Sequence, residues 1–373
     1  MSVYWNDRIR SIDPYVPGEQ PRDRKYVKLN TNENPYPPSP RTLEAIKAAA
    51  AESLRLYSDP VCLDLRKAIA ERYGVTVERV FVGNGSDEIL AFAFGAFYGE
   101  RSDAGDPAAP LLFPDITYSF YSVYAKLWNI PYETVPLGDD FSLRAADYLR
   151  PSGGVVFPNP NAPTSRALSL PEVLTVVDAQ AKDNRVVLVD EAYVDFGAES
   201  TVPYVASRPN LLTVHTLSKS RSLAGLRVGF AIGQEALIEG LNRVKDSFNS
   251  YTLDRCALAG AAAAMADTVY YDEVNARVVA TRERTAAALV LLGFSVVPSS
   301  ANFLFVSHPA VAGENLFKGL RERGVLVRWF KKPRIENWLR VSVGTDEDMA
   351  AFLTACEELT ATSSRGAIRK EMV

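Results

Sequence analysis

The sequence has few of the residues that several common kinds of chemistry require. It contains three cysteines and two histidines among 373 residues. Cys62, Cys256 and Cys356 lie far apart and form no CxxC pair, which argues against a disulfide framework or a thiolate zinc site. Two histidines, His215 and His308, are too few for a multi-histidine metal site and make a histidine-centred triad improbable. We therefore expect no metal site and a chemistry carried by other groups.

The sequence also lacks long apolar runs and a strong charge of one sign. No uninterrupted apolar stretch reaches the roughly 18 residues that a membrane-spanning helix needs. The opening MSVYWNDRIR carries charges where a signal peptide needs apolar residues. The net charge is -4, and scattered Lys and Arg residues give no broad positive field for nucleic acid or anionic lipid. These features predict a cytoplasmic protein whose partners are small molecules.

Length and pattern predict an arm followed by two domains. The chain has 47% hydrophobic and 23% charged residues, which is typical of folded proteins. Residues 1–40 are rich in Pro and Asn and predict an extended arm. In residues 41–275, a strongly helix-forming stretch at 41–55 comes first. Apolar runs beginning at positions 80, 111, 155, 186, 211 and 227 then alternate with helical stretches, which predicts an α/β domain with a mainly parallel sheet. Residues 276–373 alternate expected strands, one of them VLVRWF, with helices in the manner of a smaller α+β domain.

Polar clusters follow three of the expected strands. They are PNPNAPTS at 158–165, VDEAY at 189–193 and TLSKSRSLAGLR at 216–227. Because ligands of open α/β sheets bind beyond the carboxyl ends of the strands, we expect these clusters to converge on one crevice.

A glycine-containing turn precedes an apolar helix at GNGSDE, residues 83–88. The free backbone N–H groups of Gly85, Ser86 and Asp87 are suited to hold a phosphate at the start of that helix. A simpler interpretation is that Ser86 caps the helix and Asp87 complements its dipole. The two interpretations are compatible.

In these segments the sequence resembles the fold-type-I pyridoxal phosphate (PLP) aminotransferases of class II and, within them, the histidinol-phosphate aminotransferase family. The resemblance covers nearly the full length. It implies a large domain with a mainly parallel seven-stranded sheet between helices, a smaller α+β domain, and an arm that packs on the small domain and on a partner subunit. The segments that carry it, in family order, are NTNENPYPPSP, LYSDP, GNGSDE, PDITY and LRVSVGT.

Three residues carry the expected catalysis. Lys219 would hold the cofactor as a Schiff base, so its amine must be partly deprotonated, and burial together with the nearby cation Arg227 would lower its pKa. Asp190 ends an apolar strand, where a carboxylate is costly unless it is paired, and it would pair with the protonated pyridine nitrogen. By resemblance, Tyr193 would hydrogen-bond the phenolic oxygen of the cofactor.

The resemblance assigns further cofactor contacts. Tyr118 would stack on the pyridine ring. Arg227, with Thr216 or Ser218, would complete the phosphate site. Tyr57 would reach the phosphate in the partner subunit's site, which implies a homodimer.

The segment NAPTS departs from the family pattern Asn-Asn-Pro-Thr-Gly. The asparagine that usually touches the phenolic oxygen aligns with Ala162. We expect Asn161 to take over part of that contact. Ser165 replaces the usual glycine, which requires a turn that accepts a Cβ atom.

The expected substrate site lies in the small domain and the arm. Arg340 matches the arginine that binds a substrate carboxylate or phosphate, and guanidinium groups suit both anions. Arg328 and Tyr15 match positions that recognise histidinol phosphate in the family. The resemblance implies transfer of the amino group of L-histidinol phosphate to 2-oxoglutarate, giving imidazole acetol phosphate and glutamate, in histidine biosynthesis.

Four other functions compete with this interpretation. An aromatic amino acid aminotransferase would share every cofactor residue, and a threonine-phosphate decarboxylase-like lyase would also use Lys219. A PLP-binding transcriptional regulator needs a DNA-binding domain, for which the chain has no room. A nicotinamide dehydrogenase needs a GxGxxG turn, which GNGSDE does not supply.

Overall fold

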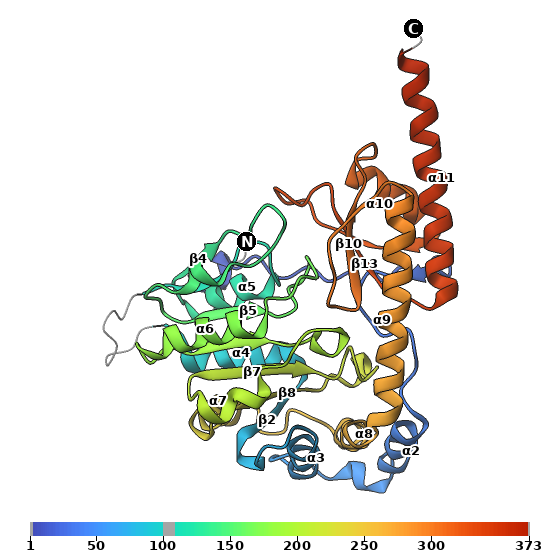
Figure 1. Cartoon of the computed structure of the whole chain (residues 1–373). Helices are drawn as coiled ribbons and strands as arrows, with labels where there is room; N and C mark the ends of the chain where they lie inside the picture. Colours follow the sequence, from blue (N-terminus) through green and yellow to red (C-terminus); the bar gives the residue numbers. More distant parts are fainter. Residues whose placement is uncertain (1–2, 100–108, 372–373) are drawn as a thin grey trace.

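The computed structural model describes residues 3–99 and 109–371, with side chains as far as residue 361. Its centre is a seven-stranded sheet in the order β2-β8-β7-β6-β5-β3-β4 (Figure 1). Among the described strands of this sheet, β8 alone runs antiparallel to its neighbours. The expected mainly parallel sheet is therefore confirmed. The strands are β2 (Val80–Gly83), β3 (Leu111–Pro114), β4 (Tyr132–Val135), β5 (Val155–Pro158), β6 (Val187–Asp190), β7 (Leu211–Thr216) and β8 (Gly229–Gly233).

Each face of this sheet is covered by helices over its own core. Successive side chains of a strand point to opposite faces, so Val187 and Val189 enter one core while Leu188 enters the other. The first core includes residues of α3 (Leu63–Tyr73), α6 (Leu170–Ala181) and α8 (Arg255–Ala266). The second includes residues of α4 (Gly85–Phe97), α5 (Phe120–Trp128) and α7 (Glu235–Phe248). A strand buried on both faces must be apolar throughout, which explains the uninterrupted apolar runs.

Two local predictions were wrong. The helix expected over residues 41–55 ends earlier: α2 (Pro40–Ala49) begins after the N-cap Ser39, and a separate 3₁₀ turn, η1 (Glu52–Arg55), follows it. The strand β4 was not expected, because three of its four residues are exposed at the sheet edge and form no apolar run.

A second, antiparallel sheet forms the core of the smaller domain, in the order β12-β13-β10-β9. These strands are β9 (Ser295–Val296), β10 (Phe303–Ser307), β12 (Arg328–Trp329) and β13 (Leu339–Ser342). Its core also takes residues from α9 (Thr268–Leu291), α10 (Gly313–Glu322) and α11 (Asp346–Glu371), and α11 projects from the body in Figure 1. The single strand expected at VLVRWF is instead two, because β11 (Val325–Leu326) joins a different sheet.

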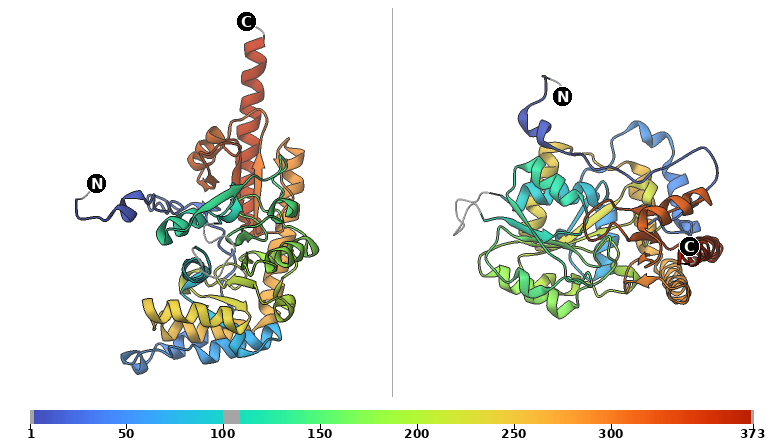
Figure 2. Two further views of the ribbon diagram at one scale, coloured as in Figure 1. Left: turned by 90° about the vertical axis from the view of Figure 1, so that its left-hand side faces the viewer. Right: turned by 90° about the horizontal axis from the view of Figure 1, so that it is seen from above.

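The N-terminal arm is tied to the smaller domain. Its strand β1 (Val27–Lys28) pairs in parallel with β11, and Leu29 is buried in the core of that domain. The arm is not wholly extended, because residues Asp7–Ser11 form the short helix α1, with Asn6 accepting a hydrogen bond from the backbone N–H of Ile9. Figure 2 shows the start of the arm reaching away from the body.

The boundary expected at residue 276 falls inside the helix α9. Tyr271, in its first turn, belongs to a core of the large sheet, whereas Leu289, near its end, belongs to the core of the smaller domain. We keep the division into an arm (1–40), a large domain (41–275) and a small domain (276–373) as a proposal. In the described part of the chain, no helix combines the length and apolar character needed to cross a membrane.

Candidate active site

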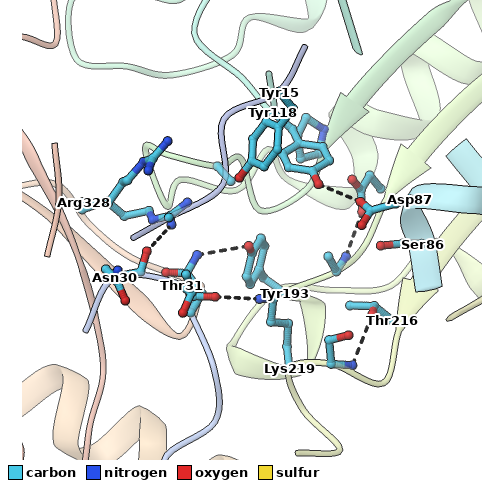
Figure 3. Close-up of a pocket in the computed structure, with 18 of the residues that line it drawn as sticks. Tyr15, Asn30, Thr31, Ser86, Asp87, Tyr118, Tyr193, Thr216, Lys219 and Arg328 are labelled. Carbon is cyan, nitrogen blue, oxygen red and sulfur yellow. Dashed lines mark hydrogen bonds between the residues drawn. The ribbon is translucent and has the colours of Figure 1, made fainter. Parts of the chain in front are cut away.

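A cavity of about 150 Å³ lies beyond the carboxyl ends of β6 and β7, where the arm and the small domain meet the large domain. Residues from all three parts of the chain line it, and Figure 3 shows their side chains. The expected convergence of the strand-end clusters is therefore observed. The predicted site residues in this lining are Tyr15, Ser86, Asp87, Tyr118, Asp190, Tyr193, Thr216, Ser218, Lys219, Arg227, Arg328 and Arg340.

Lys219 follows β7 and turns its amine into the cavity. Its Nζ atom donates a hydrogen bond of 3.0 Å to the backbone oxygen of Thr31, an arm residue (Figure 3). Burial, followed by the charge of Arg340, lowers the pKa of Lys219 to about 8. A substantial fraction of this amine is therefore neutral near pH 8, as a nucleophile or general base requires.

Asp190 is the last residue of β6 and is 5% exposed. Its Oδ2 atom accepts a hydrogen bond of 3.0 Å from the Tyr121 hydroxyl, and its Oδ1 atom accepts one of 3.2 Å from the backbone N–H of Ala192. Burial raises the pKa of Asp190 to about 6. Among the described residues it has no ion-pair partner, so this buried carboxylate suits a cationic group of a ligand.

The start of α4 forms an anion cradle beside Arg227. Gly85 has φ +75°, and a Cβ atom there would lie 2.7 Å from the Arg227 NH2 atom. A Cβ atom on Gly229 would lie 2.5 Å from the backbone nitrogen of Ser86. Both glycines therefore allow the helix start, its free N–H groups and the guanidinium to pack closely.

Polar side chains complete this cradle. Arg227 donates to Asp87 Oδ2 at 3.1 Å and to Ser218 Oγ at 3.4 Å. Thr216 Oγ1 accepts from the Ser218 backbone N–H at 3.2 Å. The expectation that Ser86 caps the helix is wrong, because Asn84 occupies the N-cap and its side chain makes no capping hydrogen bond. Asp87 does lie in the first turn, where a carboxylate complements the helix dipole.

Two tyrosines line the cavity, and the hydroxyl of one donates a hydrogen bond while that of the other accepts one. Tyr118 donates to Asp87 Oδ1 at 2.7 Å (Figure 3). The Tyr193 oxygen accepts a hydrogen bond of 3.1 Å from the side-chain amide of Asn32. The Tyr193 ring also lies beneath the Lys219 amine, whose Nζ atom is 5.9 Å from the ring centroid.

The opposite end of the cavity is cationic. Arg340 donates to the Asn30 backbone oxygen at 2.9 Å, and its buried Nε atom has no hydrogen-bond partner among the described residues. Arg328 donates to the backbone oxygens of Val16 and Pro17 in the arm, at 3.1 and 3.3 Å. Tyr15, which stacks on Phe120 with ring centroids 4.3 Å apart, lies beside them.

Three predicted cofactor residues are absent from the lining of this cavity: Gly85, Asn161 and Tyr57. The Asn161 side-chain amide donates to the Ile116 backbone oxygen and to Thr164 Oγ1, at 3.0 and 2.8 Å, and its expected contact with the cofactor stays a prediction. Tyr57 is 79% exposed and stacks on Tyr251 with centroids 4.6 Å apart. Its expected contact with a partner subunit's site stays a prediction.

Sequence reasoning missed several neighbours of the site. Tyr121 lies in the first turn of α5, three residues beyond Tyr118, which precedes that helix. Thr31 contacts Lys219 through its backbone oxygen, so the identity of its side chain gives no indication of this contact. Beneath the cavity lies a buried polar cluster in which His215 Nε2 is 3.4 Å from Glu191 Oε2. It was not expected, because its members alternate along the chain with the predicted site residues.

Comparisons with known proteins agree with this geometry. Residues 24–355 match the family of class I and II aminotransferases. Histidinol-phosphate aminotransferase of Clostridium acetobutylicum is 53% identical over 97% of this chain and 100% of its own length. Histidinol-phosphate aminotransferase 1 of Bordetella parapertussis is 55% identical over 96% of this chain and 99% of its own.

A solved structure shows the same fold. It is histidinol-phosphate aminotransferase of Sinorhizobium meliloti in complex with pyridoxal-5'-phosphate, with a TM-score of 0.85 and 24% identity, covering 97% of this chain and 99% of that chain.

The fold and the cavity define an aminotransferase of fold type I, with a half-buried lysine and a buried carboxylate in one pocket. Within that class, the chain belongs to the histidinol-phosphate aminotransferase family. This membership confirms the resemblance that the sequence motifs indicated.

Proposed function

We propose that this chain transfers the amino group of L-histidinol phosphate to 2-oxoglutarate, giving imidazole acetol phosphate and glutamate, as a step of histidine biosynthesis. The observation that carries the proposal is the placement of Lys219, Asp190 and the α4 helix start around one cavity. The cofactor is PLP, which when bound supplies an electron sink and carries the amino group between the two substrates.

The residues of the cavity fit this cofactor. Lys219 would hold it covalently, and Asp190 would pair with its ring nitrogen, which explains a buried carboxylate without an ion pair among the described residues. The start of α4 and Arg227 would hold its phosphate. Tyr118 and Tyr193 would contact its ring and its phenolic oxygen.

Lys219 also serves as the general base. With its pKa lowered to about 8, the Nζ atom exists partly in the neutral form that removes a proton from the substrate carbon bearing the amino group. Asp190 would place its negative charge against the ring nitrogen of the cofactor, and the Tyr193 hydroxyl would donate a hydrogen bond to the phenolic oxygen.

The cationic end of the cavity supports a phosphorylated substrate. Arg340 and Arg328 line the same cavity, and Arg340 keeps one buried donor, Nε, that is not used by any described residue. Two guanidinium groups provide more donors than a single carboxylate needs and suit a dianionic phosphate. Tyr15 adds a hydroxyl at the same end.

A homodimer is the assembly that we propose, with Tyr57 reaching the partner subunit's site. An apolar surface supports it: Leu56, Tyr57 and Val61 are 51%, 79% and 53% exposed, and Tyr251 is 45% exposed beside them. Apolar surface of this kind marks interaction sites on proteins. We place the enzyme in the cytoplasm, where its proposed substrates are metabolised.

A panel of half-reactions tests the proposed substrate. The PLP-loaded enzyme is mixed with histidinol phosphate, phenylalanine, tyrosine or threonine phosphate, and loss of the visible cofactor band is followed. We expect histidinol phosphate to react fastest, and 2-oxoglutarate to restore the band with formation of glutamate. Faster reaction with the aromatic amino acids, or release of carbon dioxide from threonine phosphate without 2-oxoglutarate, would overturn the assignment.

A further inference from the structure

A chain of hydrogen bonds links the small domain, the arm and Tyr193. Asn32 is an arm residue that is 1% exposed. Its side-chain Nδ2 atom donates to the Tyr193 hydroxyl oxygen at 3.1 Å. Its backbone N–H donates to Ser342 Oγ at 2.8 Å, and Ser342 Oγ donates to Asn32 Oδ1 at 2.9 Å. Ser342 belongs to β13 of the small domain, whereas Tyr193 belongs to the large domain.

The direction of each bond in this chain follows from its donors. The Asn32 backbone N–H can only donate, so Ser342 Oγ accepts from it and its own proton is available for Asn32 Oδ1. Oδ1 is thereby fixed on Ser342, and the amide NH₂ must face Tyr193. The Tyr193 oxygen therefore accepts a hydrogen bond, and its own proton is left to donate elsewhere.

The backbone of Asn32 is held in a conformation suited to this task. Its φ is +55°, a left-handed conformation that asparagine tolerates better than most residues. Its backbone oxygen accepts from the Asn302 side-chain amide at 3.0 Å. Both peptide groups and the side chain of Asn32 are thus engaged by the small domain, which leaves its carboxamide little freedom.

We propose that Asn32 is a positioning residue for Tyr193: its carboxamide, locked by Ser342, occupies the tyrosine oxygen and directs the hydroxyl proton into the cavity, toward the phenolic oxygen of the cofactor. This inference rests on the proposed function. It gives Tyr193 a fixed donor role at a site where Ala162, which also lines the cavity, has no amide to offer.

The groups around this bond fit the assignment. Tyr193 lies among Lys219, Arg340 and Asp190, and burial raises the pKa of its hydroxyl, so the proton stays on the oxygen at neutral pH. Because the Tyr193 oxygen already accepts a hydrogen bond from Asn32, its O–H proton is free to donate a second one. A donor to the phenolic oxygen stabilises negative charge there and so disfavours proton uptake by the bound chromophore.

The test is a pH titration of the visible cofactor band without substrate. Asn32→Gly removes the carboxamide and keeps the left-handed backbone free of strain. We expect it to raise the pH midpoint by up to about 1 unit, since a hydrogen bond contributes about 0.5–1.5 kcal/mol and one unit corresponds to about 1.4 kcal/mol. Tyr193→Phe should raise the midpoint in the same direction, and Asn32→Gly should add nothing in the Tyr193→Phe background.

A matched control and a second variant keep the test decisive. Asn129 ends α5 at φ +56°, far from the cavity, so Asn129→Gly makes the same backbone change and should leave the midpoint unaltered. Ser342→Ala frees the Asn32 carboxamide without altering residue 32, and should also raise the midpoint. The inference is overturned if neither variant moves the midpoint, or if the Asn32→Gly and Tyr193→Phe shifts add in full. A wild-type protein that forms no visible band with PLP overturns the proposed function instead.

Discussion

Tyr121 donates its hydroxyl proton to Asp190 across 3.0 Å, inside the core between α5 and the sheet. This hydrogen bond lowers the pKa of Asp190, which burial raises to about 6. Tyr121→Phe should therefore raise the pKa of Asp190 further and weaken the negative partner of the cofactor nitrogen. We expect kcat/KM to fall about tenfold at pH 7.5, and by more as the pH decreases toward 6. Steady-state rates between pH 5.5 and 8.5 measure this.

Tyr148→Phe is the matched control for that variant. Tyr148 is 1% exposed, and its hydroxyl has no hydrogen-bond partner in the described part of the chain. Removing it should leave the pH profile unchanged. A profile for Tyr121→Phe that parallels the wild type at every pH would contradict the role assigned to the Tyr121–Asp190 bond.

The lowered pKa of Lys219 predicts how covalent loading depends on pH. Attachment of PLP to cofactor-free enzyme needs the neutral amine, whose fraction rises about tenfold per pH unit below the pKa. With a pKa of about 8, the attachment rate should rise from pH 6 and level off above pH 8. Stopped-flow absorbance measures the rate. A rate that keeps rising to pH 10 would mean that burial does not lower this pKa.

Lys219→Ala should abolish the covalent link altogether. Reduction with borohydride followed by peptide mass analysis should find the cofactor on the peptide that contains Lys219 in the wild type, and on none in the variant. Lys318→Ala, on the exposed face of α10, is the control and should keep the link, because its amine only pairs with Glu314. Retained linkage in Lys219→Ala would refute the assignment.

Arg328→Ala should separate the two leading substrate classes. We expect it to reduce kcat/KM for histidinol phosphate by about a hundredfold, because a charge-assisted contact to phosphate is lost, and for phenylalanine by much less. Arg323→Ala, at the end of α10, removes an exposed arginine that pairs with Glu358 and should affect neither substrate. Equal losses for both substrates would favour an aromatic aminotransferase.

Mixing subunits tests the reach of Tyr57. Tyr57→Ala and Lys219→Ala should each be strongly impaired as homodimers. If Tyr57 completes the site of the other subunit, a mixed dimer holds one site with both wild-type residues, and activity should recover toward a quarter of the wild-type value at equal mixing. Absence of recovery in a mixture shown by native mass spectrometry to exchange subunits would place Tyr57 outside the neighbouring site.

The sequence predicted those parts of the site that strand ends and helix starts determine. Lys219, Asp190 and the turn before α4 each follow or precede a strongly patterned element, so their convergence could be inferred from the rule for open sheets. The Asn32–Tyr193 bond could not, because it joins residues 161 positions apart and depends on the folded position of the arm. The hydrogen bond from the Asn161 amide to the Ile116 backbone oxygen could not be inferred for the same reason, because it joins residues 45 positions apart.

The fold shows the same division. Strands buried on both faces can be recognised in the sequence as apolar runs. The strand β4 is mostly exposed, so its sequence forms no apolar run. The split of VLVRWF into β11 and β12 depends on β1, which lies almost 300 residues away in the chain. The local hydrophobic pattern does not predict how a strand pairs when tertiary packing determines its partner.

The pairing of β1 with β11 has a consequence for how the protein is made. Leu29 is synthesised well before the rest of the core that buries it, whose other buried residues lie beyond position 288. The strand β1 therefore stays without its partner strand until β11 has been synthesised. A fragment that starts at residue 276 would carry an apolar gap where Leu29 belongs, so the small domain needs the arm to complete its core.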